Sequence, residues 1–355
     1  MNSAFWNGKK VFLTGHTGFK GSWLSLWLQK VGTHVVGYAL APPTHPSLFD
    51  GARVADGMTS IVGDIRNFGD LRKALTLHRP EIVIHMAAQA LVGRSYEEPI
   101  ETYTTNVIGT VNVLEAVRNL DDIRVVVSIT SDKCYENKEW QWGYRENDCL
   151  GGDDPYSSSK SCAELVINSY RKSYFCPRKD GRKGTVLASC RAGNVSGGGD
   201  WAKDRLIPDI MRAMMDDRTV SIRRPHAIRP WQHVLEPLHG YLSVAEKLWF
   251  HGHEYAQAWN FGPDQEDGKP VSWIADYITA SWGKENGWEL DSDHYPEENN
   301  YLKLDCSRAR NLLGWAPKLS VAKSLDWVVE WYRDYYRSGD MRSLTVEQIN
   351  RFEKI

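Results

Sequence analysis

The chain has 355 residues with a formal net charge of −2, and 42% of the residues are hydrophobic. This length suits one large α/β domain or two smaller ones, and the lack of a basic block argues against binding to nucleic acid or to an anionic membrane. The N-terminus has no signal-peptide pattern and no apolar run reaches the roughly 18 residues that cross a membrane, so we expect a cytoplasmic protein.

Apolar runs that predict strands alternate with amphipathic stretches that predict helices. In chain order we expect a strand at 10–14, a helix at 21–32, strands at 33–40 and 58–65, a helix at 68–78, a strand at 81–88, a helix at 104–119, a strand at 124–131, a helix at 158–174 and a strand at 184–194. The strands are continuous Val, Ile and Leu runs, typical of strands buried on both faces. Their alternation with helices requires crossover connections, which predicts an α/β fold with a doubly wound parallel sheet.

After about residue 195 this alternation weakens, and glycine, proline and charged residues become dense. We interpret this part as a cap on the substrate side. The six cysteines form no CxxC pair, so we expect reduced thiols and no metal site.

The segment TGHTGFKGSW places Gly15, Gly18 and Gly21 between a predicted strand and a predicted helix. In this context the first glycine permits a tight turn and the second lets the backbone approach a pyrophosphate. The N-terminus of the following helix supplies free N–H groups for the same anion. The sequence therefore predicts a dinucleotide site, the alternative being a tight turn that binds nothing.

The second strand ends without the acidic residue that usually binds the adenosine ribose. The expected position is near Ala39, the next carboxylate is Asp50 and the next cation is Arg53. A 2′-phosphate thus has no partner, so we expect NAD rather than NADP, with a looser hold on the ribose. Asp64 is a candidate acceptor for the adenine amino group, with Ile65 on the ring; alternatively, Asp64 caps the next helix.

The segment YSSSK places Tyr156 and Lys160 four residues apart at the start of a predicted helix, hence on one face. A free phenol has a pKa near 10, so a base working near pH 7 needs a depression of about 3 units, or about 4 kcal/mol. A close ammonium and a positive nicotinamide ring supply stabilisation of that order. The alternative is a solvated pair on a helix surface, which the position after the fifth strand disfavours.

Together the glycine turn, Asp64, HMAAQA at 85–90, Asn106 and the Tyr156–Lys160 pair resemble the extended short-chain dehydrogenase/reductases that act on nucleotide sugars. Further segments that carry the resemblance are CRAGNVSGGGD (190–200), RPWQHV (229–234), NFGP (260–263) and LGWAP (313–317).

This resemblance implies a Rossmann NAD-binding domain at 1–190, to which segments near 228–262 return, and a smaller α/β substrate-binding domain mainly at 191–355. It also implies a homodimer or homotetramer that pairs through helices 104–119 and 158–174. The residues that it assigns to the cofactor are Gly15, His16, Thr17, Gly18, Phe19, Gly21, Asp64, Ile65, Ala87, Ala88, Gln89, Asn106, Tyr156 and Lys160.

The stretch SITSDKCYEN, residues 128–137, indicates the reaction. By resemblance, 4-epimerases have Ser or Thr followed by small or neutral residues, whereas 4,6-dehydratases have an acid next and then a second acid–base residue, usually Glu. Ser131, Asp132 and Lys133 follow the dehydratase pattern and resemble the enzymes that act on CDP-glucose, where Lys replaces Glu. PPTHPSLF, AAQALV and YLKLDCSRA also resemble that group.

The implied reaction converts CDP-glucose to CDP-4-keto-6-deoxyglucose and water, with hydride transfer from C4 to C6 through bound NAD, for deoxysugars of the lipopolysaccharide O-antigen type. In it, Tyr156 takes the C4 hydroxyl proton, while Lys160 lowers the pKa of Tyr156 and holds the nicotinamide ribose. Ser131, or alternatively Thr130, shares a hydrogen bond with the C4 oxygen. Asp132 protonates the departing water.

The role of Lys133 has several alternatives. A neutral Lys133, with its pKa depressed by burial or by nearby positive charge, would remove the C5 proton. A charged Lys133 would instead stabilise the enolate or position water or Asp132. The bland alternative for both residues is a surface ion pair at a strand end, which contributes little.

Substrate contacts also follow from the resemblance. Gln89, Ser95, Tyr96 and Ser131 line the hexose site, and Asn194 and Arg229 meet the diphosphate; alternatively, Arg229 forms a structural ion pair. The dTDP-sugar enzymes have an arginine before the segment equivalent to YLKLD. This chain has PEENN at 296–300 instead, which fits recognition of a different nucleotide base. We interpret His85 as a strand-end histidine bonded to the backbone.

Three other functions remain open at this point. A nucleotide-sugar 4-epimerase needs no acid at Asp132. A 4,6-dehydratase of another nucleotide sugar uses the same chemistry. It stays open because only the resemblance indicates which nucleotide base the substrate carries. A cofactor-sensing binding protein on this fold commonly lacks the Tyr–Lys pair, so the presence of Tyr156 and Lys160 argues against that class.

Overall fold

The computed structural model describes residues 1–177, 184–284, 287–291 and 301–355. Its centre is a seven-stranded sheet in the order β11-β6-β5-β4-β1-β2-β3, with every neighbouring pair parallel. The strands are β1 Lys10–Thr14, β2 His34–Ala39, β3 Thr59–Val62, β4 Ile82–His85, β5 Val125–Ile129, β6 Val186–Ala192 and β11 Ala258–Phe261. The predicted α/β doubly wound sheet is thus confirmed. The strand order reverses between β1 and β4, and their carboxyl ends mark the switch point where such folds bind ligands.

Alternate residues of the central strands face opposite helical layers. Phe12, Val83, Val126 and Leu187 join a core with helices α4 (Phe68–His78), α7 (Gly109–Arg118) and α8 (Pro155–Ser173). Their neighbours in the strands pack on the other side against α2 (Phe19–Lys30), α10 (Leu235–His251) and α13 (Met341–Lys354). Burial on both faces explains the continuous apolar runs.

The predicted helix at 104–119 has two parts, because its first turn is a π-helix, η2 (Thr104–Ile108), that continues into α7. The helix predicted at 158–174 begins earlier, at Pro155, where the carboxylate of Asp154 accepts a hydrogen bond from the Ser157 N–H at 2.9 Å. This cap sets Tyr156 in the first turn of α8.

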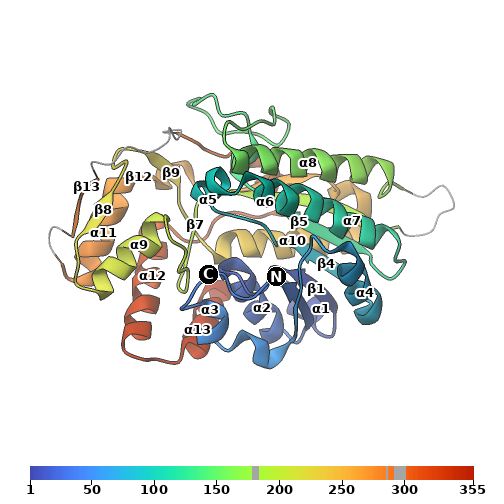
Figure 1. Ribbon diagram of the computed structural model, residues 1–355, viewed down its shortest axis with the longest axis horizontal. Coiled ribbons are helices and arrows are strands. Elements are labelled where there is room, and N and C mark those ends of the chain that lie inside the picture. Colours follow the sequence, from blue (N-terminus) through green and yellow to red (C-terminus); the bar gives the residue numbers. More distant parts are fainter. Residues whose placement is uncertain (178–183, 285–286, 292–300) are drawn as a thin grey trace.

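The chain beyond β6 contributes both to the sheet and to a smaller lobe, which lies at the left of Figure 1. Strand β11 pairs with β6 and α10 packs beneath β5 and β6. The smaller lobe contains α9 (Leu206–Met215), α11 (Val271–Trp282), α12 (Val321–Tyr336) and the strand pairs β8 (Val220–Ile222) with β13 (Trp288–Leu290) and β9 (Ile228–Pro230) with β12 (Gly268–Pro270). Strands β7 (Val195–Ser196) and β10 (Gln232–His233) pair where the two parts meet.

The remaining elements are short. They are α1 (Ser3–Trp6), α3 (Leu48–Gly51), α5 (Val92–Glu97), α6 (Pro99–Tyr103), η1 (Val54–Gly57), η3 (Asp132–Cys134), η4 (Gly252–Tyr255), η5 (Gln265–Asp267) and η6 (Ala309–Leu313). All six cysteines lie in the described ranges and are free thiols. Over those same ranges, no helix has the length and apolarity to cross a membrane, and no three His, Cys, Asp or Glu side chains group to hold a metal ion.

Candidate active site

The three glycines of the turn after β1 have different environments. A Cβ on Gly15, whose φ is +79°, would lie 2.8 Å from the Ala87 nitrogen, and one on Gly21 would lie 2.1 Å from the Gly15 oxygen. These two positions need glycine because the backbone packs so closely there. A Cβ on Gly18 would meet only the Gly15 oxygen at 3.5 Å, so Gly18 borders open space.

Gly18 is also the N-cap of α2, and no side chain caps this helix. The N–H groups of its first turn therefore point into the open space beside Gly18 without a side-chain acceptor. This arrangement fits a pyrophosphate, which takes such N–H groups as donors and gains from the positive end of the helix dipole.

Side chains near the turn are used within the protein. His16 Nε2 lies 2.7 Å from the Ser60 hydroxyl, and burial lowers the pKa of His16 to about 4. The Thr17 hydroxyl donates to the Leu40 oxygen at 2.8 Å, which ties the turn to the end of β2. Phe19 is half-buried at the first position of α2. Their contacts with the cofactor stay predictions.

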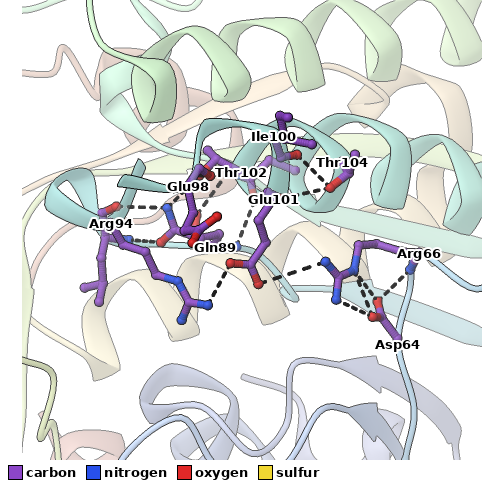
Figure 2. Close-up of polar contacts among 11 residues, drawn as sticks. Asp64, Arg66, Gln89, Arg94, Glu98, Ile100, Glu101, Thr102 and Thr104 are labelled. Carbon is purple, nitrogen blue, oxygen red and sulfur yellow. Dashed lines mark hydrogen bonds and ion pairs between the residues drawn. The ribbon is translucent and has the colours of Figure 1, made fainter. Parts of the chain in front are cut away.

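Asp64 lies after β3 and is held by Arg66 (Figure 2). Its carboxylate accepts hydrogen bonds from the Arg66 N–H at 2.8 Å and from Nε at 2.8 Å; burial would raise the pKa of Asp64, but these bonds outweigh it and lower the pKa. An ion-pair chain continues from Arg66 to Glu101 at 4.0 Å and from Glu101 to Arg94 at 2.7 Å. The helix cap is Asn67, so the alternative that Asp64 caps α4 is wrong.

Asn106 joins the end of β4 to α8. Its side chain accepts from the Gln89 N–H at 2.9 Å and donates to the Gln89 oxygen at 3.0 Å and to the Ser159 hydroxyl at 2.8 Å. Ala87 and Ala88 precede this clamp, and the Ala87 N–H donates to the Thr14 hydroxyl at 3.1 Å. Ile65 is buried against α7, since a Cβ on Gly109 would lie 2.5 Å from its side chain.

The candidate acid, Asp132, lies in the short helix η3, which follows β5. We call the longer segment Thr130–Tyr135, which contains η3, the catalytic turn. The Ser131 hydroxyl accepts from the Lys133 N–H at 3.2 Å and donates to Asp132 at 3.0 Å. Asp132 is only 4% exposed, and burial raises its pKa against the opposing effects of Lys133, Ser131 and Arg229. A buried carboxyl with a raised pKa is suited to donate a proton.

Tyr156 and Lys160 are both buried on the inner face of α8. Burial raises the pKa of Tyr156 to about 12, although the Ser131 hydroxyl and the Arg205 charge lower it, and burial lowers the pKa of Lys160 to about 8. The residues of the chain alone therefore raise the phenol pKa; the depression that we expect relies on the positive nicotinamide ring as well as on Lys160, and it stays a prediction. The residues of the chain keep the phenol neutral near pH 7, because its loss of hydration outweighs these contacts.

The predicted substrate residues surround this centre to different degrees. The Ser95 hydroxyl accepts from the Tyr156 N–H at 3.2 Å and so fixes the start of α8, while Tyr96 beside it is 47% exposed. Arg229 on β9 is close enough to influence Asp132. The oxygen of Asn194 accepts from the Gln232 N–H at 3.0 Å, which places Asn194 between β6 and β10. The segment PEENN at 296–300 lies outside the described residues.

Two cations of this site were missed in the sequence. The Lys20 ammonium on α2 donates to the Tyr241 hydroxyl at 3.0 Å, and burial, followed by the charges of Lys160 and Arg205, lowers its pKa to about 7. Arg205 pairs with Asp200 at 3.0 Å and faces Tyr156. The position of Lys20 inside the glycine turn was a usable signal; Arg205 lies far along the chain, and no local pattern marks it.

A family model described as GDP-mannose 4,6 dehydratase matches residues 12–327. The chain belongs to the GDP-mannose 4,6-dehydratase family. A relative named CDP-glucose 4,6-dehydratase, from Salmonella typhimurium, is 55% identical over 99% of this chain and 98% of its own.

More distant relatives match over almost the same length. A UDP-glucose 4-epimerase from Mycolicibacterium smegmatis is 26% identical over 92% of this chain and 99% of its own. A crystal structure of dTDP-glucose 4,6-dehydratase from Bacillus anthracis in complex with NAD superposes with a TM-score of 0.77 at 21% identity, covering 95% of this chain and 100% of that one. The dehydratase-family fold therefore spans nearly the whole chain.

His85 at the end of β4 gives a pH prediction. Its ring lies between the hydroxyls of Thr14 at 2.8 Å and Thr110 at 3.0 Å rather than against the backbone, which corrects our interpretation. The Thr110 hydroxyl donates to the Asn106 oxygen at 2.7 Å, so it accepts from Nε2–H and leaves Nδ1 to accept from Thr14. Burial lowers the pKa of His85 to about 3.

Because the folded pKa lies below the unfolded one, the unfolded chain takes up a proton first as the pH falls. We expect the free energy of unfolding to drop below pH 6.5, by up to about 1.4 kcal/mol per pH unit for this group. Urea denaturation at pH 6.5 and pH 5 should show a drop that is about 2 kcal/mol smaller in His85→Gln. An equal drop in both proteins would contradict this account.

Proposed function

We propose that this protein is an NAD-dependent CDP-glucose 4,6-dehydratase that forms CDP-4-keto-6-deoxyglucose and water. The observation that carries the proposal is the buried Asp132 with its raised pKa, joined to Ser131 and facing the same site as Tyr156. An elimination needs an acid for the leaving hydroxyl, whereas a 4-epimerisation does not. The identity of 55% to the Salmonella enzyme supports CDP-glucose as the substrate.

The cofactor assignment is supported by the open space at Gly18 and the uncapped N-terminus of α2. The residues that would hold NAD are the glycine turn, the Asn106 clamp at Gln89, and Lys160. When bound, NAD would supply a hydride acceptor for C4 of the hexose, a hydride donor for C6 and a positively charged ring. The residues of the chain alone leave the Tyr156 phenol neutral.

The side chains of the chain then divide the proton transfers. Tyr156 removes the C4 hydroxyl proton, and the Ser131 hydroxyl holds the same oxygen. The C4 ketone acidifies the C5 proton, and Asp132 protonates the C6 hydroxyl as it leaves. Lys133, half-buried in the catalytic turn, removes the C5 proton in its neutral form and returns a proton to C5 after the hydride reaches C6. In its charged form it would instead stabilise the enolate or position Asp132 or a water molecule, and water would accept the C5 proton.

The remaining assignments are proposals of the same kind. Gln89, Ser95, Tyr96, Asn194 and Arg229 bind the nucleotide sugar, and the product enters deoxysugar synthesis for lipopolysaccharide.

We also propose a homodimer or homotetramer that pairs through α7 and α8. Leu165 on α8 is 58% exposed and Ile108, just before α7, is 50% exposed. Light scattering should then give a multiple of the 40.4 kDa chain mass, and a monomer would contradict this pairing.

A substrate panel tests the function directly. The purified protein with NAD should convert CDP-glucose faster than the dTDP-, GDP- or UDP-glucose analogues. Alkali-treated product should show the ultraviolet absorbance of a 4-keto-6-deoxy sugar, which an epimerisation product lacks. Deuterium at C4 should be recovered at C6; release of that deuterium to solvent, or its failure to reach C6, would contradict the proposal.

The Asp132→Asn variant tests the acid. It keeps the size of the side chain but cannot donate a carboxyl proton, so dehydration should slow by roughly 100- to 10,000-fold. Nicotinamide reduction in a single turnover should stay near the wild-type rate, because Asp132 acts after C4 oxidation. Asp50→Asn, at an exposed position of helix α3, serves as the matched control. Turnover by Asp132→Asn at the wild-type rate would remove Asp132 from this role.

A further inference from the structure

Helix α8 carries a third buried ionisable side chain, Glu164, four residues after Lys160 and eight after Tyr156. Glu164 is 2% exposed, and its two carboxylate oxygens are fully engaged. One accepts from the Thr130 hydroxyl at 2.5 Å, and the other accepts from Ser189 at 3.0 Å and from Arg191 at 2.7 Å. The spacing of four places Glu164 on the same helix face as the proposed catalytic pair.

Arg191 extends this contact to the far end of the catalytic turn. Its other terminal nitrogen donates to the Tyr135 hydroxyl at 2.7 Å, and that hydroxyl donates to Asn260 at 2.7 Å. Thr130 and Tyr135 stand at the two ends of the turn that carries Ser131, Asp132 and Lys133. One buried ion pair therefore holds both ends of the turn.

The charge of Glu164 also acts on Lys160. Burial lowers the pKa of Lys160 to about 8, and the nearby Cys134 and Glu164 oppose this effect. Lys20 of α2 and His85 of β4 face Lys160 from the other elements, and Lys20 is a like charge. With Cys134 an uncharged thiol whose pKa burial raises, Glu164 is the anion among these neighbours that favours the ammonium.

We propose that Glu164 is a positioning residue: through Thr130 and Arg191 it fixes both ends of the catalytic turn, and its negative charge keeps Lys160 as an ammonium beside Tyr156. This inference rests on the proposed function for its catalytic consequence. The geometry of the ion pair and the charge of Lys160 are independent of the substrate.

Glu164→Gln tests the charge, because the amide oxygen still accepts from Thr130. We expect the alkaline limb of the pH profile of kcat, where Lys160 loses its proton, to move down by about one pH unit. The KM for CDP-glucose should change less than twofold. Glu164→Asp restores the charge and should return the limb toward its wild-type position.

Glu236→Gln is the matched control. Glu236 is another buried carboxylate on a long helix, α10, and it accepts from the N–H groups of Lys318 at 2.8 Å and Leu319 at 2.7 Å, away from the catalytic turn. Its variant should leave the limb at its wild-type position. A Glu164→Gln variant whose limb is equally unmoved would overturn the proposal.

Glu164→Gln leaves Arg191 buried without its partner, which threatens folding. The double variant Glu164→Gln with Arg191→Met removes both buried charges and so avoids the unpaired Arg191. Its limb should move in the same direction by a smaller amount, because loss of the Arg191 charge favours the Lys160 ammonium.

A readout without substrate is the NMR titration of the lysine side-chain carbons, with Lys160→Met to assign the signal. The Lys160 midpoint should fall by about one unit in Glu164→Gln. An unchanged midpoint overturns this inference, whereas a wild type that leaves CDP-glucose unchanged refutes only the proposed function.

Discussion

Burial of ionisable side chains at the carboxyl ends of β5 and β6 is the constraint on which this site depends. Loss of hydration favours the uncharged form of every group, so it raises the pKa of Asp132 and Tyr156 and lowers that of Lys160. The same effect thus makes Asp132 easier to protonate than a solvated carboxylate, and it leaves a phenol that needs a nearby positive charge before it can act as a base. Access of water would restore the hydration of the charged forms and so reverse these pKa shifts.

The fold creates this dry edge because its strands are parallel. Their carboxyl ends meet at one side of the sheet, and helices α2 and α8 begin there with their N-termini toward the site. Hydroxyl groups satisfy several of the buried polar atoms that result: Thr14 bonds with His85, Ser131 with Asp132, and Ser159 with Asn106. Each short side chain fills a hydrogen-bonding need where a longer one would fill the site.

The sequence predicted the sheet, the glycine turn and the Tyr156–Lys160 pair because each has a local signal, namely an apolar run, a spacing of three and a spacing of four. It did not reveal that Asp64 is held by Arg66, since the orientation of an exposed side chain depends on its neighbours. It also did not reveal that burial by the chain itself raises the pKa of Tyr156, because burial depends on the whole fold. Glu164 continued the spacing of four, and only the structure shows Arg191 of β6 beside it.

Gly193 shows how closely the two parts of the chain fit. A Cβ there would lie 3.0 Å from the carboxylate of Asp132 and 2.7 Å from the ring of Pro230 on β9. Asp132, after β5, and Pro230 of β9 therefore both contact the same glycine. Movement of Pro230 away from Gly193 would expose the Asp132 carboxyl to solvent and weaken the burial that raises its pKa, so the packing of the smaller lobe against Gly193 helps to tune the acid.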